Sequence, residues 1–242
     1  MAETPDAKTP AVAAEVVPVT DRTVDDVLAQ HVAALGGAEK LAAVTAVRWT
    51  GTISGRGLKG LPVTVEKKRP GKYKRLIDDP EGRSVTVFNG VAGWQQGGGP
   101  EGADAVEALP PDAITRVKRS AEIEDALVNP SAKGRTAVLL GKQKVGDSEA
   151  YAVKVTFEDQ EITYLVDVVS GLLVKSLESV PTSEGPQPAE VTYQDYRDVG
   201  GIQWSFKQIF FIPGANATQT FAWSQIEANP PLDDAIFEQP GK

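Results

Sequence analysis

The spacing of apolar residues divides the chain into a helical start and a long β-rich remainder. Between Thr23 and Gly37, apolar residues recur at intervals of three and four, which is typical of one face of an α-helix. Thr23 and Asp26 have the spacing of a capping box, and Gly36 with Gly37 is typical of a helix end. The pattern predicts a helix that begins near Thr23, then a short second helical turn over 38–44.

From Val47 onward, apolar residues alternate with polar ones, as in strands that bury one face. Short turn signals separate these runs at 70–71, 89–90, 170–171 and 200–201. One helical stretch interrupts the series. It begins at Pro110 and Pro111, has a modest apolar face that includes Leu127, and ends by Asn129 and Pro130.

The number of predicted strands decides the fold class. Some ten or more antiparallel strands with one dry face favour a strongly curled sheet over a flat one. We therefore predict a mainly β fold with some α: a curled antiparallel sheet that forms a half-open β-barrel, with two helical segments covering or plugging its concave side. Residues 1–22 lack periodicity and are predicted to be a flexible leader, and residues 23–242 a single domain.

Composition narrows the possible partners. Of the 242 residues, 41% are hydrophobic and 24% charged, which is typical of a globular chain. The formal net charge of −8 disfavours nucleic acids and anionic surfaces as partners. The absence of cysteine excludes disulfides and thiolate sites. No apolar run is long enough to be a transmembrane segment, and the first residues lack a signal-peptide pattern.

Candidate catalytic motifs have simpler interpretations. Residues 55–60 match G-x-G-x-x-G, but a strand follows where a dinucleotide site needs a helix, so a hairpin loop is favoured. His31, the only histidine, lies in an apolar helix stripe and is interpreted as a packed or capping residue. One His and no Cys leave no zinc cluster. We expect no cofactor and no metal, and we predict that the chain is not an enzyme.

The charged residues fall into two kinds of cluster. Carboxylate pairs lie mostly at predicted turns and are interpreted as solvated rather than as acid–base pairs or calcium ligands: Asp78-Asp79, Glu122 with Glu124, Glu158-Asp159 and Asp233-Asp234. The one basic cluster is interpreted as the solvated face of a hairpin, with contact to acidic partners or lipid headgroups as the alternative. It comprises Lys67, Lys68, Arg69, Lys72, Lys74 and Arg75.

The predicted strands carry more aromatic surface than two weak helices can cover. Each large aromatic side chain can bury roughly 150–250 Å², so a curled sheet with this surplus is expected to enclose a cavity for an apolar ligand. The predicted apolar lining consists of Trp49, Val63, Val65, Phe88, Trp94, Phe157, Tyr164, Trp204, Phe206, Phe210, Phe221 and Trp223.

Five stretches carry a family resemblance: 33–41, 68–72, 88–94, 193–197 and 232–237. Residues 88–94 fit a hairpin pattern in which Asp or Asn and Gly precede a Trp. Together these stretches resemble the LolA/LolB-like family of periplasmic lipoprotein carriers, within the wider set of outer-membrane lipoprotein-sorting proteins. The resemblance covers about residues 23–240 and is more specific for fold than for activity.

The resemblance implies a half-open β-barrel lidded by helices, a cavity for acyl chains and a periplasmic location. The chain has no lipobox cysteine, so the membrane-anchored receptor type is not expected. We therefore predict a periplasmic binding or carrier protein for lipid, lipoprotein acyl chains or another apolar ligand. The alternative is a non-catalytic structural or accessory subunit of a cell-envelope complex, with an envelope protein as partner and a cavity filled by its own helices.

Overall fold

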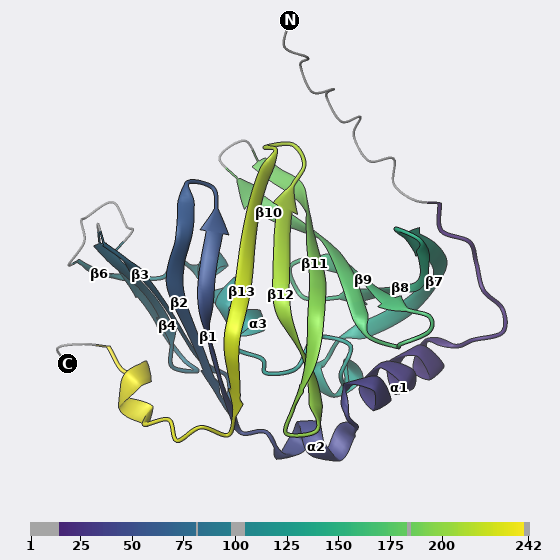
Figure 1. Ribbon diagram of the computed structural model, residues 1–242, viewed down its shortest axis with the longest axis horizontal. Helices are drawn as coiled ribbons and strands as arrows, with labels where there is room; N and C mark the ends of the chain where they lie inside the picture. Colours follow the sequence, from purple (N-terminus) through teal and green to yellow (C-terminus); the bar gives the residue numbers. More distant parts are fainter. Residues whose placement is uncertain (1–14, 81, 98–104, 183–184, 240–242) are drawn as a thin grey trace, which may run out of the picture.

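The computed structural model describes residues 15–80, 82–97, 105–182 and 185–239. It is mainly β, with a curled antiparallel sheet of 13 strands that is not closed into a barrel (Figure 1). The predicted fold class is confirmed. Most of the predicted leader lies outside the described residues, but Val17 forms two backbone hydrogen bonds with Lys142, both of 2.7 Å.

The sheet has two halves that meet at one strand pair, β1 with β13. The first half contains β1 (Ala46–Gly55), β2 (Leu58–Lys68), β3 (Lys72–Asp79), β4 (Gly82–Phe88), β5 (Gly93–Gln96) and β6 (Val106–Ala108). The second contains β7 (Thr136–Val145), β8 (Ser148–Thr156), β9 (Glu161–Asp167), β10 (Leu173–Thr182), β11 (Gly185–Val199), β12 (Ile202–Ile212) and β13 (Ala217–Ala228). The strand order places β6 and β7 at the two edges.

The central pair curves because β13 carries a bulge: Thr50 pairs with Gln225 and Gly51 with Trp223, so Ser224 of β13 has no partner in the β1 register. At Gly51 the neighbouring strand comes so close that a Cβ atom would lie 2.2 Å from the Ala222 carbonyl oxygen. Only glycine fits this approach without displacing backbone. The bulge therefore contributes to the curl of the sheet at its midpoint.

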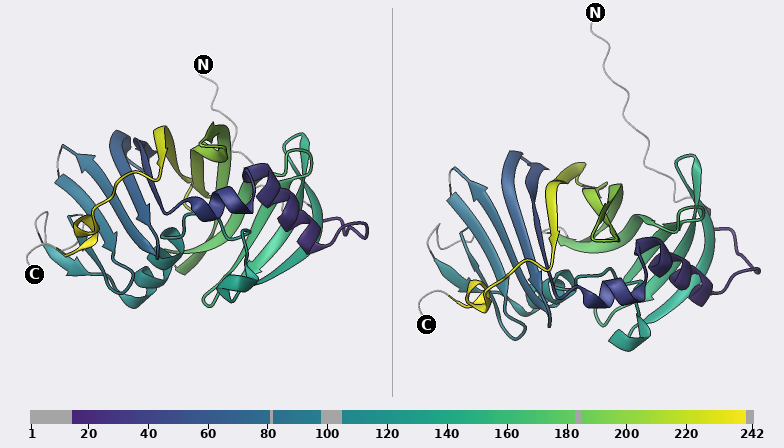
Figure 2. Two further views of the ribbon diagram at one scale, coloured as in Figure 1. Left: turned by 90° about the horizontal axis from the view of Figure 1, so that it is seen from below. Right: turned by 60° about the horizontal axis from the view of Figure 1, so that its bottom comes forward.

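The chain passes from edge strand β6 to edge strand β7 through residues 109–135, here called the crossover segment. It contains α3 (Pro111–Ser120) and η1 (Ser131–Lys133), and α3 lies on the concave side of the sheet, behind β12 and β13 in Figure 1. Helices α1 (Val24–Leu35) and α2 (Ala38–Ala43) lie along the lower rim (Figures 1 and 2). The predicted helical cover of the concave side thus comes from two separate parts of the chain.

The sequence predicted the start of α1 correctly but not the end of α3. The predicted capping box of α1 is present, since the Asp26 amide donates to Thr23 Oγ1 at 3.2 Å and the Thr23 amide donates to Asp26 Oδ2 at 2.8 Å. The prediction that α3 continues toward residue 129 was wrong, because the helix ends at Ser120. Beyond it, Ile123 and Leu127 are buried in different clusters, which a continuous helix would not permit.

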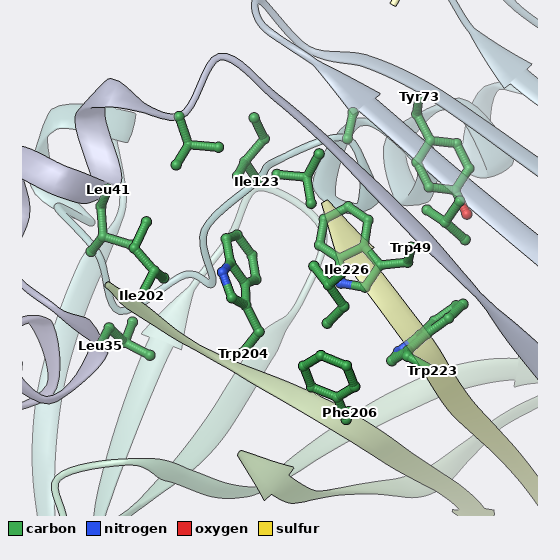
Figure 3. Packing of buried hydrophobic residues seen from close by; sticks show 14 of the residues in the cluster. Leu35, Leu41, Trp49, Tyr73, Ile123, Ile202, Trp204, Phe206, Trp223 and Ile226 are labelled. Atoms are coloured by element: carbon green, nitrogen blue, oxygen red, sulfur yellow. The ribbon is translucent and has the colours of Figure 1, made fainter. Parts of the chain in front are cut away.

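Two hydrophobic clusters lie on the concave side. The larger contains Trp49, Trp204 and Trp223, with the first two rings edge to face at 5.6 Å (Figure 3). The other lies under β8, β9 and α1 and includes Val27 and Leu127. The crossover segment contributes to both clusters and so ties the two halves of the sheet together.

A third cluster lies on the convex face. Val87 and Phe88 are consecutive in β4 and point to opposite faces; Phe88 belongs to the concave cluster, whereas Val87 packs with Trp94. Helix η2 (Asp234–Phe237) covers this pair, and Phe237 is completely buried there. The C-terminal segment is therefore part of the packed structure. Among the described residues, no helix is both long and apolar enough to cross a membrane.

We expect Phe237→Ala to lower the free energy of unfolding by about 3–5 kcal/mol, because it empties a fully buried aromatic site. Urea unfolding followed by circular dichroism measures the change. Val91→Ala, at a site that is 87% exposed, is the control and should stay within about 0.5 kcal/mol of wild type. Equal stability of both variants would show that the C-terminal segment is dispensable.

Candidate functional site

A cavity of about 750 Å³ lies between the concave face and the crossover segment. Its wall is built from strands of both halves of the sheet, from α3 and from residues 122–126. The volume falls within the range of typical small-molecule sites, about 300–1,000 Å³. The cavity is the space that the helices leave uncovered.

The structure brings eight of the twelve predicted lining residues to this wall: Trp49, Val65, Phe157, Tyr164, Trp204, Phe210, Phe221 and Trp223. Phe221 stacks on Trp223 with ring centroids 5.6 Å apart. Phe157, Phe210 and Phe221 remain partly exposed, whereas the tryptophans are buried. Part of the aromatic surface therefore faces open space. That these residues bind a ligand stays a prediction.

The remaining four predicted residues do not line the cavity. Val63, Phe88 and Phe206 are buried in the same cluster as Trp49 and support the wall from within. Trp94 packs against Phe237 on the convex face. The sequence pattern of β5 shows that successive side chains lie on opposite faces, but it does not show which face is the concave one.

The charged part of the wall was not predicted from the sequence. Five cations and four carboxylates line the cavity in the described part of the chain: Lys67, Arg75, Arg116, Arg119, Arg135, Glu122, Glu124, Asp125 and Glu178. The signal that was overlooked is the run Glu122-Ile123-Glu124-Asp125, in which acids flank a buried apolar residue. Such a run indicates a segment that buries one apolar side chain and forms ion pairs on either side of it.

The interpretation of Glu122 and Glu124 as solvated turn residues was wrong. Their side chains are only 23% and 8% exposed, and both are paired. Glu122 accepts from Lys133 Nζ at 2.8 Å and also pairs with Arg135. Burial raises the pKa of Glu122, but hydrogen bonds from Arg135 and Lys133 outweigh burial and hold this pKa below its usual value.

The β2–β3 hairpin holds the next residues of the crossover segment. Lys67 Nζ donates to the Glu122 carbonyl oxygen at 2.7 Å, and Arg69 pairs with the Glu124 carboxylate. Lys68 and Lys72 instead reach Asp234 on the convex side, at 2.8 and 3.1 Å. The interpretation of this basic cluster as a purely solvated face was therefore wrong, since its cations bind both the crossover segment and the C-terminal segment.

His31 anchors the crossover segment to α1. Its side chain is completely buried, Nε2 lies 2.9 Å from Asp125 Oδ2, and Nδ1 lies 2.8 Å from the Gly171 carbonyl oxygen. Burial lowers the pKa of His31, but the Asp125 charge and the two hydrogen bonds more than compensate, so its pKa is raised. The predicted packed role of His31 is confirmed.

Lys67 and Arg75 differ from the other cations of the wall. Lys67 Nζ lies 4.9 Å from the Trp49 ring centroid, and burial lowers its pKa to about 8. Arg75 has only a long contact of 3.4 Å to Thr86 Oγ1. Within the described part of the chain, neither forms an ion pair with a carboxylate. No group of three or more His, Asp or Glu side chains suited to a metal ion occurs among these residues either.

No protein-family model and no curated protein matches the sequence. Several solved structures match its shape. A DUF1329 family protein from Desulfovibrio piger has a TM-score of 0.60 at 13% identity, with 89% of this chain and 97% of that chain covered. A LolA superfamily protein from Nitrosomonas europaea has a TM-score of 0.58 at 14% identity, covering 90% and 98%.

The fold is that of LolA superfamily proteins. A putative outer membrane lipoprotein-sorting protein domain from Vibrio parahaemolyticus has a TM-score of 0.57 at 10% identity, covering 89% of this chain and 95% of that chain. At these identities the likeness concerns the fold alone. The LolA-like resemblance seen in the sequence is confirmed at this level.

We expect the His31–Asp125 contact to give stability a defined pH dependence. The pKa of His31 is raised above 6.5, so its contribution is complete below pH 6.5 and disappears as the pH rises through the folded-state value. The pKa of Asp125 is lowered from 3.8, so its contribution is present above pH 3.8 and is lost as the pH falls. The contact should therefore be strongest between these limits.

Urea unfolding of wild type and His31→Gln tests this expectation. The loss of unfolding free energy should be larger at about pH 5.5 than at about pH 8.5, where wild-type His31 is losing its charge. Asp125→Asn keeps the shape of the side chain but removes its charge. Its loss of unfolding free energy should likewise be larger at about pH 5.5 than at about pH 8.5. A loss that is equal at both pH values would contradict the assigned charge of the pair.

Proposed function

We propose that the protein is a non-enzymatic carrier that binds an acyl chain or a similar apolar ligand reversibly in the cavity. The observation that carries this proposal is the partly exposed aromatic wall around a space of about 750 Å³. A ligand that covers Phe157, Phe210 and Phe221 removes their surface from water. This transfer is favourable in proportion to the apolar area buried.

Further support comes from the fold. One solved structure with the same fold is described as a putative outer membrane lipoprotein-sorting protein domain. On this ground we extend the proposal to lipid or lipoprotein acyl chains as ligand and to the periplasm as location. The accessory-subunit alternative expects a cavity that the protein's own helices fill, and the space of about 750 Å³ favours the carrier instead.

Entry of a chain would require a local opening at the crossover segment. This segment forms one wall of the cavity and is held by ion pairs and hydrogen bonds at Glu122, Glu124 and Asp125. Half-buried ion pairs can be replaced by water at moderate cost, whereas a packed aromatic layer opens less easily. We therefore assign the moving part to the crossover segment and the fixed part to the sheet.

A series of fatty alcohols of about 8 to 18 carbons should bind with rising affinity. Each added CH₂ group should strengthen binding about fourfold, because burial of one CH₂ is worth about 0.8 kcal/mol. The rise should stop when the chain exceeds the cavity. Quenching of tryptophan fluorescence by brominated alcohols measures binding, since three of the four tryptophans line the cavity. Affinity that is independent of length would contradict the proposal.

Ala113→Phe should weaken alcohol binding by about tenfold, equivalent to about 1.4 kcal/mol. Ala113 lies on α3 and lines the cavity, so a larger side chain there occupies ligand space. Ala42→Phe, at an exposed position of α2, is the matched control and should bind as wild type does. Equal affinities for both variants would mean that the alcohols bind elsewhere.

A further inference from the structure

We propose that the ligand is an amphiphile with one anionic head, a carboxylate or a phosphate, which Lys67 and Arg75 bind at the β2–β3 end of the cavity. This inference rests on the proposed function and specifies its ligand class. It assigns the apolar wall to the tail and two residues of the hairpin to the head.

The register of β2 and β3 places the two cations together. Val65 pairs with Arg75 and Lys67 pairs with Tyr73, so Lys67 and Arg75 are diagonal neighbours on one face of the hairpin. Diagonal neighbours on paired strands lie roughly 7–8 Å apart at their backbones, within reach of long side chains. Both side chains line the cavity. The pair can therefore hold one carboxylate or phosphate between them.

Their donors are largely unused, in contrast to those of the other lining cations. Arg116 donates to Asp112 at 2.7 Å, Arg119 donates to Asp159 at 2.6 Å, and Arg135 pairs with Glu122. Lys67 uses one of its three donors, for the Glu122 carbonyl oxygen. Arg75 has five donors and one long contact to Thr86. In the described part of the chain, these two are the lining cations without a carboxylate.

A cation in this environment gains from an anionic ligand. Burial lowers the pKa of Lys67 to about 8, although Glu122 and Glu124 act against burial, and Lys133 lowers the pKa further. An anion at Lys67 Nζ would replace the hydration that burial removes, and charge-assisted hydrogen bonds are among the stronger ones. An anionic group is therefore a favourable partner for Lys67.

The apolar wall begins directly beside this pair. Trp49 lies under Lys67, and Trp204 packs edge to face on Trp49 (Figure 3). Figure 3 also shows Trp223 and Tyr73 around the same space. A ligand with its head at Lys67 and Arg75 can therefore lay its tail along the aromatic wall. The lining carboxylate without an ion pair among the described residues, Glu178, lies on β10, far along the sheet order from β3.

The test compares ligands that share a tail and differ in the head. Dodecanol, dodecanoate and dodecyl phosphate are titrated into the full chain at about pH 7, with acetate and inorganic phosphate as tail-free anions. We expect both anionic amphiphiles to bind at least about tenfold tighter than dodecanol. The tail-free anions should bind far more weakly than either. Inorganic phosphate that binds as tightly as dodecyl phosphate would identify a free-anion site and overturn the inference.

Two variants locate the head. Lys67→Met with Arg75→Met should lose the preference for anionic amphiphiles over dodecanol. Arg75→Met alone should lose part of that preference, and it removes no short hydrogen bond that holds the fold. Arg83→Met, at an exposed residue that pairs with Asp78 outside the cavity wall, removes the same charge from the same region and should retain the preference.

The outcomes separate this inference from the proposed function. If dodecanol binds but wild type shows no preference for anions, the inference fails and the carrier function stands. A preference that survives in the double and single variants has the same meaning. If no ligand with a tail binds, the carrier function itself fails.

Discussion

The rest of the structure depends on the ion pairs and hydrogen bonds that attach the crossover segment to the open sheet. The strand order leaves β6 and β7 at opposite edges, and the chain between them must span the concave side. Glu122, Glu124 and Asp125 are fixed by groups from the β2–β3 hairpin and from α1. Because the β2–β3 hairpin belongs to the first half of the sheet and α1 packs on the second half, the segment links the two halves.

This arrangement explains why the interior is part core and part cavity. Where the crossover segment and α1 contact the sheet, Ile123, Leu127 and Val27 complete two packed clusters. Where α3 passes over β3 and β4, Ile114 and Val117 pack on the core, while Ala113, Arg116 and Arg119 line the cavity and leave the aromatic wall opposite partly uncovered. The space left there follows from the path of the chain, since a connection of this length cannot cover a 13-stranded sheet.

The β2–β3 hairpin shows how one basic run serves three purposes. Successive residues of a strand point to opposite faces, so Lys67 enters the cavity while Lys68 reaches Asp234 on the convex side. At the turn, Arg69 binds the crossover segment through Glu124. The cations that look alike in sequence are distinguished only by the face and the partner that the register gives them.

The sequence by itself determined the curled antiparallel sheet, the capped first helix, the packed role of His31 and most of the aromatic wall, because each depends on local periodicity, capping chemistry or hydrophobic surplus. It did not determine the end of α3, the inward or outward position of Trp94, or the pairing of Glu122 and Glu124. Those features depend on contacts such as His31 with Asp125 and Arg69 with Glu124, which join residues far apart in the chain. Only the tertiary structure brings them together, and only it reveals which cations of the cavity are left without a counter-charge.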